Sequence, residues 1–386
     1  MENLLVNKVA AVKEVRQAAE YQKKKQACIL TGLAGSSKPV FFAAADKLLG
    51  GKGSMAFITA SREEIRTYRR ELNYLYPDLP MQELYPVSLP RVQADTQSLE
   101  LQAGRAAALR FLSGEERGIV FITAEALQQK QLRPSGMSGK ALQLAVGEEH
   151  EQRNIAAALL DLGYERTEQV DALGQFCLRG DILDVYPINS STAVRIEWFD
   201  NELDAMRSFD VDTQRSLQTL TSIKIAPLKV DESFSYDADI FEYCAADTMV
   251  VVDEPVHVFS MLEKLDKENK EHASELFGKQ ELIEQLAANG AVLVSALGHS
   301  YLQQLPSLNI PVRAVAPYNK NTNLLVEDLQ NWLAEGITPL IMLSGSIKAR
   351  GFADNLRNYG LKGHFSQKSF EPGVVNVTYG DLDHMA

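Results

Sequence analysis

The sequence predicts an α/β protein: a parallel sheet with helices on both faces, a small α+β unit inserted into it, and a second, smaller α/β domain. Two observations predict this class. Short apolar runs alternate with amphipathic stretches over residues 26–123, and the same alternation resumes after residue 221. Between these parts, residues 125–210 contain a helical pattern followed by short strands that are separated by turn residues.

The length of the chain also requires more than one core. A single hydrophobic core rarely serves a chain of 386 residues, so two or three domains are expected. The predicted segments are 1–124 (first part of the α/β domain), 125–210 (inserted unit), 211–317 (completion of the α/β domain) and 318–386 (small α/β domain). Residues 311–321 are expected to connect the last two.

The elements of the first segment follow from periodicity. Residues 4–25 place apolar side chains near one face of a helix and end on three lysines, which suit the C-terminal end of a helix dipole. Apolar runs rich in β-branched and aromatic residues predict strands at 26–33, 55–59, 81–85 and 118–123. Amphipathic stretches predict helices at 40–49, 62–76 and 96–112.

The later elements follow from the same patterns. The inserted unit is expected to hold strands at 140–147, 176–186, 194–200 and 203–209 and a helix at 151–162. The α/β domain is expected to resume with strands at 222–226, 248–253 and 291–296 and helices at 256–267 and 279–288. The small domain is expected to contain helices at 324–336 and 346–359 and strands at 338–344 and 374–378.

Composition and charge narrow the class of protein. Apolar residues make up 45% of the chain and charged residues 23%, as in globular proteins. A net charge of −12 offers no global attraction to phosphate backbones, so little or no direct DNA binding is expected. The three cysteines have no zinc spacing and fit a reducing cytoplasm. No apolar run approaches the length of a membrane span, so we expect a cytoplasmic protein.

The strand at 194–200 carries a candidate interaction surface. A period of two gives it two faces: Val194, Ile196 and Trp198 on one, and Arg195, Glu197 and Phe199 on the other. The first face is expected to be core. Arginine beside an accessible aromatic is typical of a protein-binding hot spot. The alternative is that Phe199 lies under a neighbouring loop while Arg195 pairs with Glu197 or another carboxylate.

The loop after the first strand has the position of a phosphate-binding loop. Such a loop needs Gly-x4-Gly-Lys-Ser/Thr, because backbone N–H groups, the lysine and the hydroxyl hold phosphate and Mg²⁺. Gly32, Gly35 and Lys38 are present, but Ser37 replaces the glycine before the lysine and Pro39 replaces the hydroxyl residue. We interpret this loop as vestigial and expect no bound cofactor.

Asp253 and Glu254 end a strand in the manner of the acidic pair of an ATPase, in which Asp binds Mg²⁺ and Glu orients water. Without a working phosphate loop there is no metal–phosphate centre for the pair to act on, so we interpret the pair as vestigial too. We expect this acidic strand end to cap the following helix.

No other catalytic group is predicted from the sequence. The six histidines do not pair at metal spacing, so no metal is expected. Asp181 and Asp184 lie three apart on a strand and therefore point to opposite faces, which excludes a general acid/base couple. We expect Asp181 to orient Arg179 or to cap the turn.

A family resemblance covers this same stretch. The elements RGDILDVYP, VRIEWFDNELDAMRSFD and DTQRS resemble the signature of the nucleotide-excision-repair protein UvrB and of the transcription-repair coupling factor Mfd. In both families this small domain binds UvrA. The resemblance implies UvrA contacts at Arg179, Arg195 and Phe199, and it favours an accessible Phe199 over a covered one.

Departures from UvrB favour the coupling factor. The aromatic-rich hairpin that UvrB carries between the positions of Leu84 and Asp95 is missing, and the phosphate loop has lost its working residues. The resemblance implies a non-enzymatic N-terminal module that recruits UvrA to stalled RNA polymerase and takes part in masking that site. The polymerase-binding, translocase and masking modules that follow in this family are not present in this sequence.

Two alternatives remain open from the sequence. The chain could be part of a divergent UvrB-like, ATP-dependent DNA-repair enzyme. It could also bind only the modules of its own longer protein and act as a brake.

Overall fold

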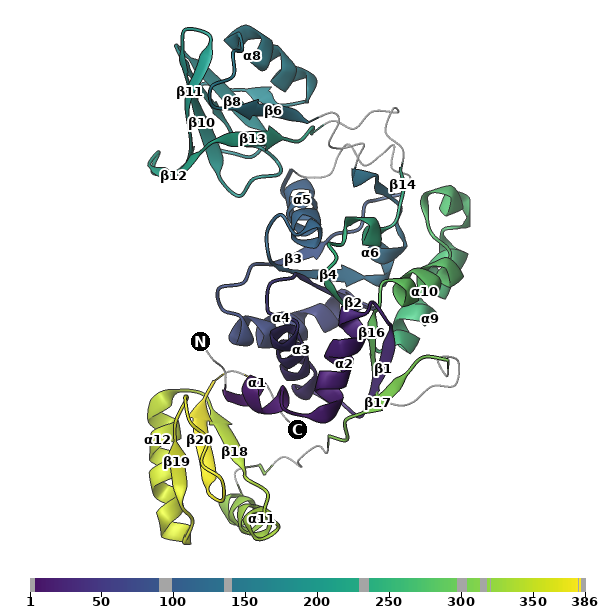
Figure 1. The fold of residues 1–386 in the computed structure, drawn as a ribbon, viewed down its shortest axis with the longest axis vertical. Helices are drawn as coiled ribbons and strands as arrows, with labels where there is room; N and C mark the ends of the chain where they lie inside the picture. Colours follow the sequence, from purple (N-terminus) through teal and green to yellow (C-terminus); the bar gives the residue numbers. More distant parts are fainter. Residues whose placement is uncertain are drawn as a thin grey trace.

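A computed structural model describes residues 4–89, 99–134, 141–228, 236–296, 304–312, 318–319, 321–380 and 382. A seven-stranded sheet forms the centre of the molecule (Figure 1), and every pair of neighbouring strands in it is parallel. Its strands, in spatial order, are β17 (Ser307–Asn309), β1 (Cys28–Thr31), β16 (Val292–Ser295), β15 (Met249–Asp253), β2 (Met55–Thr59), β4 (Ile119–Thr123) and β3 (Met81–Leu84).

Helices cover both faces of this sheet. The first core cluster gathers side chains from α5 (Leu99–Ser113), α6 (Ala124–Gln128), α9 (Pro255–Glu268) and α10 (Lys279–Ala288). The second gathers side chains from α1 (Leu4–Val9), α2 (Lys13–Lys23), α3 (Ser37–Leu48) and α4 (Arg62–Leu75). Strand β15 contributes Val250 to the first cluster and Val251 to the second, since successive side chains point to opposite faces. The predicted fold class is confirmed.

The helix predicted over residues 4–25 is broken in the structure. Val12 adopts an extended backbone at the start of α2, so the chain turns between α1 and α2. The guanidinium of Arg16 donates a 3.3 Å hydrogen bond to the carbonyl of Ala10, which supports the turn. Periodicity alone did not reveal this break, because apolar residues continue through it.

The inserted unit has its own sheet and core. In spatial order the six strands are β12 (Ser216–Leu220), β11 (Glu202–Phe209), β10 (Ala193–Phe199), β9 (Ile182–Val185), β8 (Gln175–Arg179) and β7 (Glu165–Arg166). Helix α8 (Gln152–Asp161) contributes to the same core cluster. Figure 1 shows this unit at one end of the molecule.

Two shorter pairings involve residues on both sides of this unit. Strand β6 (Leu142–Ala145) pairs antiparallel with β13 (Ser222–Ile225), so the strand predicted at 222–226 joins the inserted unit and not the parallel sheet. Strand β5 (Gln131–Leu132) pairs with β14 (Tyr236–Ala238). The predicted segment boundaries themselves stay predictions.

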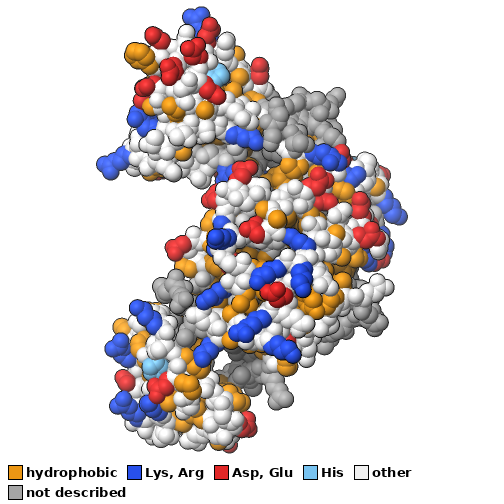
Figure 2. Space-filling view, viewed as in Figure 1, with side chains coloured by type: hydrophobic (Ala, Val, Ile, Leu, Met, Phe, Trp, Pro, Cys, Tyr) orange, Lys and Arg blue, Asp and Glu red, His pale blue; other side chains and the backbone are white. Residues whose placement is uncertain are grey.

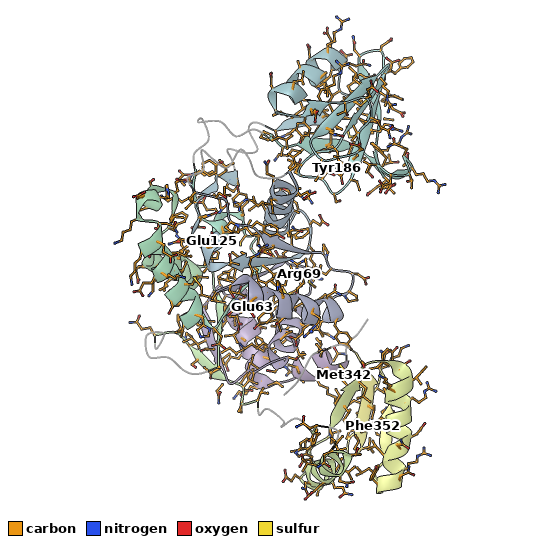
Figure 3. All side chains as sticks on the ribbon, turned by 180° about the vertical axis from the view of Figure 1, so that it is seen from behind. Glu63, Arg69, Glu125, Tyr186, Met342 and Phe352 are labelled. Atoms are coloured by element: carbon orange, nitrogen blue, oxygen red, sulfur yellow. The ribbon has the colours of Figure 1, made fainter. Side chains whose placement is uncertain are left out.

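The small C-terminal unit contains a three-stranded parallel sheet. Its strands, in spatial order, are β18 (Leu340–Leu343), β20 (Val375–Tyr379) and β19 (Gly363–Phe365), with helices α11 (Thr322–Ala334) and α12 (Ser346–Asn355). Met342 on β18 and Phe352 on α12 lie in this unit (Figure 3). The hydroxyl of Tyr74 on α4 donates a 3.4 Å hydrogen bond to the carbonyl of Tyr379, which ties the unit to the central one.

The described chain also contains 3₁₀ segments at Ile240–Tyr243, Lys270–Glu275 and Leu356–Tyr359. Some predicted features fall partly outside the described residues, among them the segment between Leu84 and Asp95, the start of the helix at 96–112 and the connector at 311–321. Among the described helices, none has the length and apolar character needed to cross a membrane.

Candidate protein-interaction surface and phosphate-loop position

The two faces of β10 are as the alternation predicts. Val194, Ile196 and Trp198 are buried in the core of the inserted unit. The indole N–H of Trp198 donates a 2.9 Å hydrogen bond to the carbonyl of His150, so its polar atom is satisfied. The opposite face carries Arg195 and Phe199, whose surroundings decide between the two predicted alternatives.

Phe199 is exposed at the end of β10. It has 73% of its surface accessible, which is far more than its neighbour Trp198 at 6%. The register with β11 shifts between Glu197 and Trp198, and Asp200 then takes a left-handed conformation in the turn. A loop covering Phe199 is therefore excluded, and that part of the alternative is wrong.

Arg195 is held in a fixed orientation on the same face. Its Nε and Nη2 atoms donate hydrogen bonds of 2.6 and 2.8 Å to the two carboxylate oxygens of Asp184. Nη2 also donates a 3.1 Å bond to the Gln214 side chain, and the guanidinium lies 4.7 Å from the centre of the Phe209 ring. The alternative expected a carboxylate partner for Arg195, and that part of it is confirmed.

Arg179 lies beside the same carboxylate but is more accessible. Its Nη2 is 3.6 Å from Asp184 Oδ2, and its side chain is 57% exposed. The expected partner Asp181 instead accepts a 3.3 Å hydrogen bond from Gln152. The strand register explains why Arg179 lies beside Asp184 and not beside Asp181. Asp184 is opposite Cys177 on β8 and opposite Arg195 on β10, so it lies on the face that both arginines share.

A small second cluster supports this face. Cys177, Ala193 and Phe209 are buried there together with Val170, and Tyr186 packs against them from the end of β9. Figure 3 shows Tyr186 within the inserted unit. The face is therefore partly apolar beneath its arginines.

Figure 2 shows basic and acidic side chains interspersed over the surface of this unit.

Sequence reasoning missed two residues of this face, Ile182 and Arg207. Ile182 is 38% exposed and is directly opposite both Glu197 and Arg179 in the strand register. The side chain of Arg207 on β11 forms an ion pair with Glu197. The period of two within β9 and β11 was a usable signal for Ile182 and Arg207, but the register that brings them to β10 was not visible in the sequence.

The loop between β1 and α3 keeps the backbone shape that glycine allows. Gly32 has φ +86°, and a Cβ there would lie 2.6 Å from the carbonyl oxygen of Ile310. Gly35 also has a positive φ, of +52°. The hydroxyl of Ser37 donates a 2.7 Å hydrogen bond to the carbonyl of Ala34 inside the loop. Pro39 lies in the first turn of α3, where its missing N–H costs little.

Lys38 of this loop forms an ion pair with the acidic residues at the end of β15. Its Nζ lies 2.7 Å from Asp253 Oδ1 and 2.8 Å from Glu254 Oε1. The side chains of Lys38 and Asp253 are 11% and 9% exposed. Three residues that could serve a nucleotide site are thus brought together, and they bond to one another.

The pKa shifts of Lys38 and Tyr68 agree with this ion pair. Burial lowers the pKa of Lys38, but Asp253 and Glu254 raise it by more, so the net pKa is above the ordinary lysine value. Burial raises the pKa of Tyr68 well above its usual value, with a further contribution from its hydrogen bond to Asp253. At neutral pH the cluster therefore holds a charged lysine beside a protonated tyrosine.

Glu254 does not cap α9 with its side chain. It occupies the N-cap position with φ 42°, but no side-chain capping bond forms. Its carboxylate instead accepts hydrogen bonds from Lys38 and from the backbone N–H of Ala296, the latter at 3.1 Å. The predicted capping role is wrong because the side chain turns toward the loop. Within the described parts of the chain, no group of three or more His, Cys, Asp or Glu residues is placed to hold a metal.

Comparisons with known proteins cover the inserted unit and most of the chain. Residues 142–230 match the family model of the UvrB interaction domain. Over 433 residues the chain is 24% identical to the transcription-repair-coupling factor of Bacillus subtilis (strain 168), covering 92% of this chain and 36% of that protein. The resemblance to the N-terminal module of the coupling factor is confirmed.

Two further coupling factors give shorter matches. That of Escherichia coli (strain K12) is 28% identical over 165 residues, which is 43% of this chain and 14% of that protein. That of Staphylococcus haemolyticus (strain JCSC1435) is 32% identical over 202 residues, or 52% and 17%. The chain therefore spans about a third of the length of the Bacillus subtilis coupling factor, and its matches to the other two cover smaller shares.

Proposed function

We propose that this chain is a UvrA-binding module of a transcription-repair coupling factor, and that Arg179, Arg195 and Phe199 contact UvrA. The observation that carries the proposal is the exposed Phe199 beside two arginines, all within the match to the UvrB interaction domain. A large apolar side chain with 73% of its surface in water gains more from a partner than from its own fold.

The chemistry of the face defines what the partner offers. Arginines form charge-assisted hydrogen bonds with carboxylates, and their planar fork favours two parallel bonds. Phe199 requires an apolar pocket. The complementary surface on UvrA therefore combines a pocket for one aromatic ring with carboxylate or carbonyl acceptors around it.

The module is proposed to be non-catalytic. A working phosphate loop needs its lysine for phosphate and its acidic pair for Mg²⁺, whereas Lys38 here bonds to Asp253 and Glu254. Pro39 also lacks the metal-ligating hydroxyl. These features favour a binding module over an ATP-dependent DNA-repair enzyme.

The same proposal extends to the organisation of the protein. The pairing of β6 with β13 supports an inserted unit that runs past residue 210, in line with the matched range 142–230. In the full-length protein this unit would recruit UvrA to stalled RNA polymerase, and other modules would mask it until then. The relatives that this chain resembles are transcription-repair-coupling factors, which supports this link between transcription and repair.

Gel filtration with purified UvrA tests the proposal. We expect the chain and UvrA to elute together as a larger species, and we expect the chain carrying Arg195→Glu to elute separately. Separate elution of a correctly folded wild-type chain at micromolar concentrations would count against UvrA as the partner.

A further inference from the structure

We infer that Asp184 is a positioning residue: it fixes the guanidinium of Arg195 in the orientation in which a partner carboxylate meets it. The inference rests on the proposed function, because it concerns the same face. It adds a buried acidic residue to a set that otherwise contains two arginines and a phenylalanine.

The location of Asp184 allows it to act only through other side chains. It is 3% exposed, so a partner cannot reach it directly. Antiparallel pairing of β9 with β10 places it directly opposite Arg195. Its two oxygens are both used by Arg195, at 2.6 and 2.8 Å, in the fork-to-fork geometry that fixes the plane of a guanidinium.

Two more contacts fix the same plane. Gln214 accepts a 3.1 Å hydrogen bond from Arg195 Nη2, and the ring of Phe209 lies 4.7 Å from the guanidinium carbon. The hydrogen bonds described for Arg195 use Nε and Nη2. Among the described residues this leaves the Nη1 donors for an acceptor on the partner. The side chain is ordered before binding, so less conformational entropy is lost when the complex forms.

The shared carboxylate also gives the two arginines different roles. Arg195 is 19% exposed, and its charge is largely balanced by Asp184. Arg179 is 57% exposed and lies 3.6 Å from the same carboxylate. Arg195 therefore supplies directional hydrogen bonds, whereas Arg179 supplies the longer-range attraction that salt screens.

Two substitutions test the positioning role directly. In Asp184→Asn the amide can accept only one bond from the fork, and we expect the affinity for UvrA to fall about tenfold. Arg195→Lys keeps the positive charge but loses the fork, and we expect a similar loss. Asp181→Asn is the matched control, since the Asp181 carboxylate accepts a hydrogen bond from Gln152 and not from either arginine, and its affinity should equal that of the wild type.

A double-mutant cycle separates positioning from a general effect on the fold. In an Arg195→Ala background, Asp184→Asn should cause no further loss of affinity, because the side chain it positions is gone. Additive losses, or wild-type affinity of both Asp184→Asn and Arg195→Lys, would overturn the inference while UvrA binding by the wild type still supports the proposed function. Absence of binding by the folded wild type would overturn both.

Discussion

Lys38 Nζ lies 2.7 Å from Asp253 Oδ1, although the two residues are 215 positions apart in the sequence. The lysine of the degenerate phosphate loop therefore bonds to the acidic strand end that would serve Mg²⁺ in an ATPase. The pair joins the N-terminal end of α3 to the C-terminal end of β15. Parallel α/β sheets commonly bind ligands at the carboxyl ends of their strands.

Loss of this lysine should destabilise the chain. Lys38→Ala leaves two carboxylates without their counter-ion in a largely buried site, and breaking a buried pair in this way typically costs about 3 kcal/mol or more. Urea denaturation measures the change in the free energy of unfolding. Lys23→Ala is the matched control: Lys23 pairs with Glu20 on the surface at 2.8 Å, and its loss should leave the midpoint unchanged.

Nucleotide should not stabilise the protein. Since Lys38 is already bonded to Asp253 and Glu254, we expect the same melting temperature with and without millimolar ATP and Mg²⁺. Differential scanning fluorimetry measures this. Binding at a hundredfold excess over Kd would stabilise the fold by about 2.7 kcal/mol and raise the melting temperature visibly. Such a rise would instead favour the ATP-dependent alternative.

Phe199→Ala should weaken UvrA binding without weakening the fold. Removing the side chain of a true hot spot costs about 2 kcal/mol, which is roughly a 30-fold loss of affinity. The fold should be unaffected because the ring is 73% exposed. Leu217→Ala, on β12 of the same sheet and 58% exposed, is the control and should bind as the wild type does. Equal affinities for the two variants would remove Phe199 from the site.

Replacement of the neighbouring residue, Trp198, should instead weaken the fold. Trp198 is 6% exposed, packs in the core of the inserted unit and donates to the carbonyl of His150. Trp198→Ala should therefore lower the free energy of unfolding by about 3 kcal/mol or more. Near-UV circular dichroism during urea denaturation measures it. An unfolding curve identical to that of Phe199→Ala would contradict the assignment of the two faces.

The sequence predicted the elements that have a strong local pattern. The apolar runs at 55–59 and 118–123 correspond to β2 and β4 within one residue, because buried parallel strands read as continuous apolar stretches. The alternation of β10 predicted which of its side chains are buried. The residues Arg179, Arg195 and Phe199 came from the family resemblance together with this alternation.

Features that depend on tertiary pairing were not predictable in this way. The bond between Arg195 and Asp184 requires the β9–β10 register, and the bond between Lys38 and Asp253 requires the order of strands in the central sheet. The pairing of β13 with β6 joins segments nearly eighty residues apart, so a local pattern identified the strand but not its sheet.

Calorimetric titration of the chain with purified UvrA measures directly whether this face binds UvrA. We predict saturable binding by the wild type and loss of that binding in Arg179→Glu and Arg195→Glu, with an unchanged far-UV circular dichroism spectrum for Arg179→Glu. Arg179 is the more informative of the two, because its exposed side chain can be replaced with little effect on the fold. No heat of binding from a folded wild type, or undiminished binding by Arg179→Glu and Arg195→Glu, would contradict the account.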